Sequence, residues 1–145
     1  MQTSTVIGVV ATLIVVIIIG TVALFNALQS GHLGYIFRPH TVMMLDRSIE
    51  MVERYKSAWG QYPKTLGNTR TFLKEGEIFP DLDFMGPLKF GERIRHLYYE
   101  PIGNGEAYYL FGVGLDDKPF SEDDVYPTNG AIEKSNGFRK LEVSA

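Results

Sequence analysis

The sequence predicts an α+β fold, in which an N-terminal apolar helix leads to an amphipathic helix packed on a small antiparallel sheet. Three observations support this prediction. Residues 1–37 contain no Asp, Glu, Lys or Arg, residues 42–59 have helical periodicity, and an Asn-Gly turn separates two aromatic segments near residue 104. Helix and hairpin patterns that occupy separate parts of a chain are typical of α+β domains.

Residues 1–29 are expected to form a transmembrane anchor. The segment from Val6 to Leu28 is almost wholly apolar, and as a helix it would span roughly 34 Å at about 1.5 Å per residue. A hydrocarbon core is about 30 Å thick. A cleaved signal peptide normally begins with a basic region, which residues 1–5 lack. We therefore expect a retained, single-pass membrane anchor.

Residues 30–40 are expected to form a connector, because Gly31, Gly34 and Pro39 disfavour a continuous helix. Residues 41–145 then form the predicted globular domain, which opens with a helix over residues 42–59. The apolar face of this helix needs a sheet to cover it, and its predicted members are Val42, Leu45, Ile49, Val52 and Trp59.

The following segments predict irregular structure and then a hairpin. Residues 71–75 could form one or two helical turns, and residues 79–87 are expected to form a loop. In that loop we favour solvated carboxylates over metal ligands for Asp81 and Asp83. Residues 95–100 and 107–113 are the arms of the predicted hairpin, since Asn104-Gly105 is a strong turn signal between them. A third strand is expected at residues 138–143.

An acidic loop, residues 113–125, follows the second arm. Five carboxylates repel one another in this short segment, those of Asp116, Asp117, Glu122, Asp123 and Asp124. A calcium ion would relieve this repulsion, because calcium collects six to eight oxygen ligands. The alternative is a solvated acidic turn that binds nothing, since runs of like charge usually face water.

Composition restricts the function further. The chain of 145 residues has 14 basic and 17 acidic side chains, and its net charge of −3 gives no support to nucleic-acid binding. The absence of cysteine removes disulfides and thiolate metal sites. His32, His40 and His96 are scattered, and we find no catalytic triad, zinc spacing or phosphate-binding glycine loop. We therefore expect no enzymatic activity.

Two motifs occur in a recognisable order. Residues 55–63 read Y-K-S-A-W-G-Q-Y-P, and the acidic loop reads V-G-L-D-D-K-P-F-S-E-D-D-V. Over residues 42–126 the chain resembles the major, G-type pseudopilin of bacterial type II secretion systems, within the type IV pilin superfamily. The family's helix end reads roughly Y-K-x-x-x-G-x-Y-P, which is matched by Tyr55, Lys56, Gly60, Tyr62 and Pro63. Its calcium loop reads roughly L-G-x-D-G-x-x-x-S/T-x-D-D-I, which is matched by Val113, Gly114, Asp116, Ser121, Asp123, Asp124 and Val125.

The resemblance implies a structural subunit with a calcium-stabilised extracytoplasmic domain, in the periplasm or outside the cell. It also implies a calcium ligand set of backbone and side-chain oxygens from Val113, Asp116, Lys118, Ser121, Asp123 and Asp124. The three aspartates would bind through carboxylates, Val113 and Lys118 through carbonyls, and Ser121 through its carbonyl or its hydroxyl. Asp117 stands where the family usually has Gly, and Glu122 is expected to face solvent.

The implied partners are copies of the same chain or other secretion or pilus-like subunits, together with the inner membrane. The resemblance does not extend to residues 1–28, which lack the family's basic leader and F-T-L-I-E start. This departure favours an alternative function. The chain would then be a membrane-anchored accessory or binding module that kept the pseudopilin domain but does not assemble into a filament.

Overall fold

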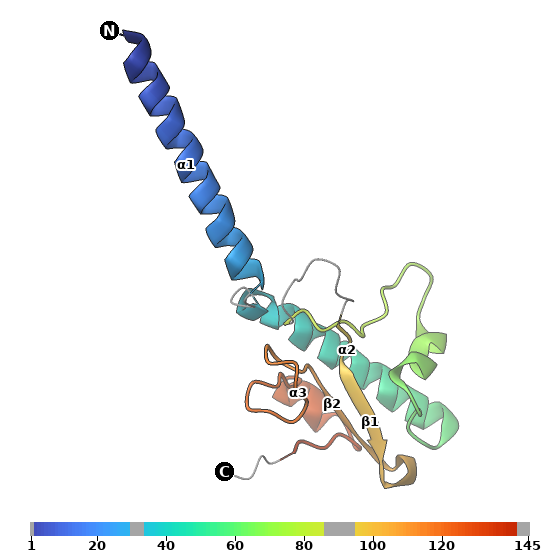
Figure 1. Cartoon of the computed structure of the whole chain (residues 1–145). Helices are drawn as coiled ribbons and strands as arrows, with labels where there is room; N and C mark the ends of the chain where they lie inside the picture. Colours follow the sequence, from blue (N-terminus) through green and yellow to red (C-terminus); the bar gives the residue numbers. More distant parts are fainter. Residues whose placement is uncertain (1, 30–33, 86–94, 142–145) are drawn as a thin grey trace.

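The computed structural model describes residues 2–29, 34–85 and 95–141, and within its first helix it describes the side chains of Val10 and of residues 12–26. The elements are the helices α1 (Gln2–Gln29), α2 (Gly34–Trp59) and α3 (Asn129–Glu133), the 3₁₀ helices η1 (Leu66–Phe72) and η2 (Gly103–Gly105), and the strands β1 (Tyr98–Ile102) and β2 (Ala107–Phe111). Figure 1 shows α1 extending away from the other elements, which gather along α2. The predicted α+β class and small antiparallel sheet are confirmed, and the sheet has two strands among the residues that the structure describes.

The predicted transmembrane anchor is wrong, and so is the single-pass inner-membrane location with a periplasmic or extracellular domain. Within the described residues, no helix combines the length and the apolar character that crossing a membrane requires.

Helix α2 begins at Gly34, inside the predicted connector of residues 30–40, and Pro39 lies within it. Because proline has no N–H, the helix lacks one backbone hydrogen bond there but continues. Most of the predicted apolar face is buried or half-buried, namely Val42, Leu45, Ile49 and Val52. Trp59 is instead 66% exposed, and its ring lies 6.2 Å from that of Tyr55.

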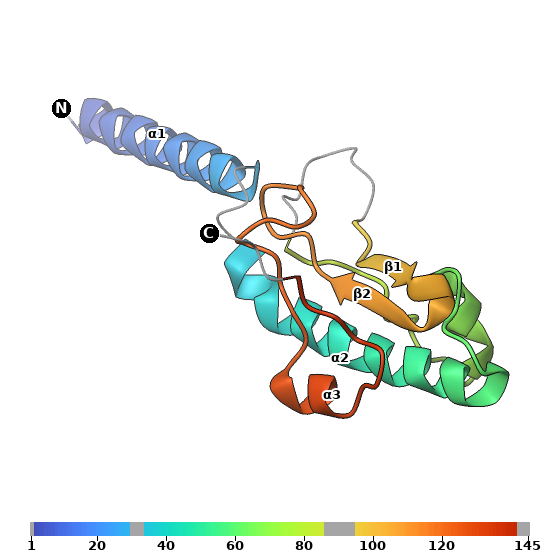
Figure 2. The same ribbon diagram turned by 90° about the horizontal axis from the view of Figure 1, so that it is seen from below.

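The predicted hairpin is present. β1 and β2 pair antiparallel from Tyr98 with Phe111 to Ile102 with Ala107. In the turn, Asn104 has a φ of +56°, a left-handed conformation that asparagine tolerates better than most residues. Figure 2 shows both strands along one side of α2, with α3 beside the same helix. One sheet face therefore packs on α2, and its Tyr108 and Leu110 are fully buried in the main core.

The predicted third strand at residues 138–143 is reduced to a single parallel bridge between Phe138 and Tyr108. Its last residues, 142 and 143, lie outside the described residues. The backbone N–H of Tyr108 donates to Gly137, and the N–H of Arg139 donates to Tyr108, both at 2.9 Å. Gly137 is needed here because a Cβ would lie 2.2 Å from the ring of Tyr62. Residues 137–139 therefore pack against the core beside Tyr62 and Tyr108, although they form only this one bridge with β2.

The carboxylate of Glu53 attaches the C-terminal segment to α2. Its Oε1 accepts hydrogen bonds from the hydroxyls of Tyr62 at 3.1 Å, Tyr108 at 3.2 Å and Ser135 at 2.6 Å. Burial first, and the nearby Glu53 charge second, raise the pKa of Tyr62 to about 12. Burial likewise raises the pKa of Tyr108. Both phenols therefore remain protonated donors to Glu53.

Candidate metal centre

The ends of the acidic loop are fastened together by backbone hydrogen bonds. Gly112 and Val125 form an antiparallel bridge, with N–H to carbonyl distances of 2.9 and 2.8 Å in the two directions. Inside the bridge, Gly114 has a φ of +70°, and a Cβ there would lie 2.6 Å from the side chain and carbonyl of Asp123. The glycine therefore lets the two sides of the loop approach closely.

Two further residues of the loop have left-handed backbone conformations. Asp117 has a φ of +61° and Phe120 a φ of +67°. The φ of Asp117 is one that glycine adopts without steric cost. The conformation is more costly for a bulky residue such as Phe120.

Ser121 links the carboxylates of three predicted calcium ligands. Its hydroxyl lies 2.6 Å from Oδ1 of Asp123 and 3.2 Å from Oδ1 of Asp116, and it can donate to either. Its backbone N–H donates to Oδ2 of Asp124 at 3.2 Å. All three aspartates therefore accept or can accept a hydrogen bond from Ser121.

Asp124 is the most unusual of these side chains, because it is 5% exposed and only one of its oxygens is paired. In the described part of the chain, no hydrogen-bond donor reaches its buried Oδ1. The pKa of Asp124 is raised to about 6, chiefly by burial. The charges of Asp123 and Asp116 also act to raise it, and the backbone groups of Phe120 and Ser121 act to lower it. A buried carboxylate oxygen without a donor is unfavourable when ionised, and a cation would relieve it.

Asp123 is better satisfied. Its Oδ2 accepts from the backbone N–H of Leu115 at 2.6 Å and of Asp116 at 3.2 Å. Burial acts to raise the pKa of Asp123, but these hydrogen bonds and that from Ser121 outweigh it, so the pKa is lowered overall. Asp123 is therefore ionised at neutral pH and brings a negative charge next to Asp124.

Asp83 supports the start of the loop, and the expectation that its carboxylate is solvated is wrong. Asp83 is 5% exposed. Its Oδ2 accepts from the N–H of Val113 at 2.8 Å, and its Oδ1 accepts from the N–H of Met85 at 2.9 Å and the hydroxyl of Thr41 at 3.3 Å. No sequence signal indicates this burial, because two of the three donors, Thr41 and Val113, come from distant parts of the chain.

A cationic side chain also contacts the loop. Nη1 of Arg95 donates to the carbonyl of Gly114 at 3.0 Å. Its Nη2 lies 2.7 Å from Oδ1 of Asp117, although that atom is not aligned for a hydrogen bond. Asp117 is 76% exposed, so this ion pair contributes little to stability. The arginine therefore neutralises the exposed side of the loop and leaves Oδ1 of Asp124 without a donor.

The remaining predicted ligands are placed as follows. Val113 is buried, Lys118 is exposed, and the N–H of Lys118 donates to Oδ1 of Asp116 at 3.0 Å. Glu122, expected to face solvent, is exposed. Among the described residues, no three acidic or histidine side chains already converge on a common metal position. The oxygen atoms of these residues and the unpaired Oδ1 of Asp124 are of the type that calcium binds. The side chains are not already arranged around one metal position.

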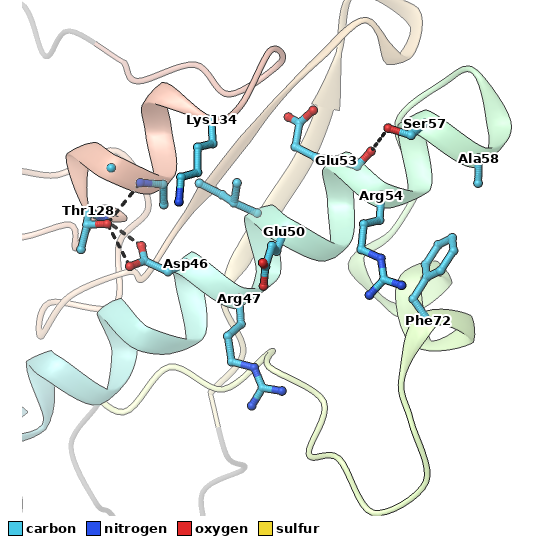
Figure 3. Close-up of a pocket in the computed structure, with 13 residues that line it drawn as sticks. Asp46, Arg47, Glu50, Glu53, Arg54, Ser57, Ala58, Phe72, Thr128 and Lys134 are labelled. Atoms are coloured by element: carbon cyan, nitrogen blue, oxygen red, sulfur yellow. Dashed lines mark hydrogen bonds between the residues drawn. The ribbon is translucent and has the colours of Figure 1, made fainter.

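A separate groove of about 830 Å³ runs along α2, with η1 and α3 contributing to its walls. Figure 3 shows Arg54 extending toward Phe72, and Asp46 joined to Thr128 by hydrogen bonds. Those bonds are 2.8 Å to the N–H and 2.9 Å to the hydroxyl of Thr128. The charged side chains that line the groove are of both signs, namely Asp46, Glu50, Glu53, Arg47, Arg54 and Lys134. Mixed charge of this kind does not select one class of ligand.

Comparisons of the chain with protein-family models, curated proteins and solved structures find no match.

Proposed function

We propose that this chain is a non-enzymatic structural subunit of a type II secretion or type IV pilus-like assembly, with a calcium-stabilised globular domain. The observation that carries this proposal is the apolar surface of α1. Its exposed large apolar side chains are Val10, Leu13, Ile14, Val15, Val16, Ile17, Ile18, Ile19, Val22, Leu24 and Phe25. A contiguous apolar surface of this kind marks an interaction site, and copies of the same helix supply a matching surface.

Calcium has a separate role in the proposal. The carboxylates of Asp116, Asp123 and Asp124, together with oxygens of Ser121, Val113 and Lys118, would hold the ion. The ion would offset the repulsion among the three aspartates and supply a partner for the unpaired oxygen of Asp124. Because it would bind the folded loop and not the unfolded chain, it would stabilise the domain by mass action.

Cysteine crosslinking tests the assembly proposal, because the chain contains no natural cysteine. Single-cysteine variants from Leu13→Cys through Leu24→Cys would be oxidised in cells that produce the full chain. We expect disulfide-linked dimers whose yield peaks every three to four positions, as one helix face meets another. Glu106→Cys, at the exposed hairpin turn, is the matched control. Yields along α1 no higher than that of Glu106→Cys would contradict the proposal.

One observation favours a second function, that of an accessory or binding module which does not assemble. The groove along α2 is large enough for a ligand, since ligand sites typically have volumes of about 300–1,000 Å³. A single monomer band after amine-reactive crosslinking of the full chain would favour this module, and a ladder of multimers would favour the structural subunit.

A further inference from the structure

The sheet face opposite α2 carries a second aromatic assembly, which we call the outer aromatic cluster. Its members are Tyr98, Tyr109, Phe111, Phe120 and Tyr126. Phe111 is 1% exposed, although it does not belong to the main core. Its ring is stacked on Tyr98 at 4.7 Å and contacts Phe120 at 5.2 Å and Tyr126 at 5.8 Å. Neighbouring rings therefore cover Phe111.

Phe120 reaches this cluster from the acidic loop. Its ring lies 5.2 Å from Tyr98 and 5.7 Å from Tyr109, edge-on to both. Aromatic pairs at such distances and angles attract one another. Phe120 nevertheless has a left-handed backbone, with a φ of +67°, and it remains 36% exposed. The surrounding loop must hold a bulky residue in that conformation.

The predicted calcium ligands supply this restraint. Ser121, the next residue, is bonded to the carboxylates of Asp116, Asp123 and Asp124. Any movement that separates the three carboxylates therefore moves the backbone on which the Phe120 ring is carried.

We propose that cation binding at the acidic loop is transmitted to the outer aromatic cluster through Phe120. This inference rests on the calcium site proposed above. A bound ion keeps the three carboxylates together and so keeps Phe120 on Phe111. When the ion leaves, the repulsion among the three carboxylates is no longer offset, and the loop holds Phe120 less firmly. Phe120 then moves away from Phe111 more often, and the sheet presents more apolar surface to solvent.

A fluorescent reporter placed at the linking residue tests the proposal in the full chain. Trp59 is the one tryptophan in the sequence, so the double variant Trp59→Phe/Phe120→Trp has a single indole in the loop. Calcium chloride added after chelation should shift the emission of this indole to shorter wavelength and reduce its quenching by acrylamide. The unaltered chain is the control, because its own indole, at the end of α2, should not respond.

Reciprocal coupling gives a second measurement. If calcium seats Phe120, then seating of Phe120 must favour calcium, because linkage between two equilibria is mutual. We expect Phe120→Ala to weaken calcium binding about tenfold, which corresponds to about 1.4 kcal/mol. Phe72→Ala is the control, since Phe72 contacts Tyr55 and Arg54 and not the loop. It should bind calcium as the unaltered chain does.

The two proposals fail in different ways. Suppose calcium raises the melting temperature of the double variant, while its emission and quenching do not change and Phe120→Ala binds calcium normally. The inference about Phe120 would then be overturned and the calcium site retained. If calcium chloride neither binds the unaltered chain nor raises its melting temperature, the calcium site is refuted, and the inference with it.

Discussion

Replacing Asp124 by asparagine should have opposite effects on stability with and without calcium. Asparagine keeps the size of the side chain and an oxygen that can accept from Ser121, but it removes the buried charge. In metal-free aspartate, ionisation at neutral pH opposes folding, because the pKa rises from 3.8 to about 6. At 1.36 kcal/mol per unit, that shift corresponds to at most about 3 kcal/mol. In chelator, Asp124→Asn should therefore unfold with a free energy higher by about 1–3 kcal/mol.

With calcium the order should reverse. At a calcium concentration 100 times the dissociation constant, the unaltered chain would gain about 2.7 kcal/mol. Asp124→Asn should gain far less, because it has lost a charged ligand. Urea unfolding of the full chain at pH 7.5, with chelator and with 10 mM calcium chloride, measures all four free energies. Glu122→Gln, at the exposed neighbouring carboxylate, is the matched control and should keep the calcium gain. A variant that is less stable than the unaltered chain in chelator, or that gains equally from calcium, would refute the reasoning.

The remaining predictions concern pH and packing. Without metal, the contribution of Asp124 to the free energy of unfolding is greatest below about pH 3.8 and is lost as the pH rises through about 6, because its pKa is raised in the folded state. Urea unfolding in chelator should show this decline, and Asp124→Asn should flatten it. Glu53→Ala leaves two tyrosine hydroxyls and Ser135 without their shared acceptor, and it should destabilise the domain by about 2–4 kcal/mol. Glu50→Ala, at an exposed carboxylate, should hardly change the stability. Equal melting temperatures for the two variants would contradict this. Gly137→Ala places a Cβ 2.2 Å from the ring of Tyr62 and should lower the free energy of unfolding by about 1–3 kcal/mol. Gly130→Ala, with no atom within 4 Å of its Cβ, should not lower it. Thermal denaturation compares the two variants.

Periodicity and turn chemistry predicted the elements that depend on local sequence. The spacing of Leu45, Ile49 and Val52 gave the buried face of α2, and Asn104-Gly105 gave the hairpin turn. The connector predicted over residues 30–40 extended too far, because α2 already begins at Gly34 and a single missing N–H at Pro39 is tolerated within a helix of 26 residues. The anchor was inferred from an apolar run alone, and it is overturned by the finding that no helix among the described residues is both long and apolar enough to cross a membrane.

The acidic loop shows where sequence reasoning stops. The sequence predicts that Asp116, Asp123 and Asp124 lie near one another, because they occupy one short loop. In the structure, all three carboxylates lie within hydrogen-bonding distance of Ser121. The burial of Asp83 and the position of Arg95 beside Gly114 had no sequence signal, since both depend on contacts between segments that are far apart in the chain. The seating of Phe120 on the outer sheet face was missed for the same reason. The calcium ligands themselves stay a prediction.

Calorimetric titration of the full chain, stripped of metal and held at pH 7.5, with calcium chloride tests the proposed calcium site most directly. We expect one ion per chain with a dissociation constant of about 10⁻⁵–10⁻³ M, the range of weaker protein sites. We also expect magnesium chloride to compete poorly, because magnesium requires a stricter octahedral shell. No heat of binding and no change in melting temperature at up to about 10 mM calcium, well above that range, would show that the loop is a hydrated acidic turn.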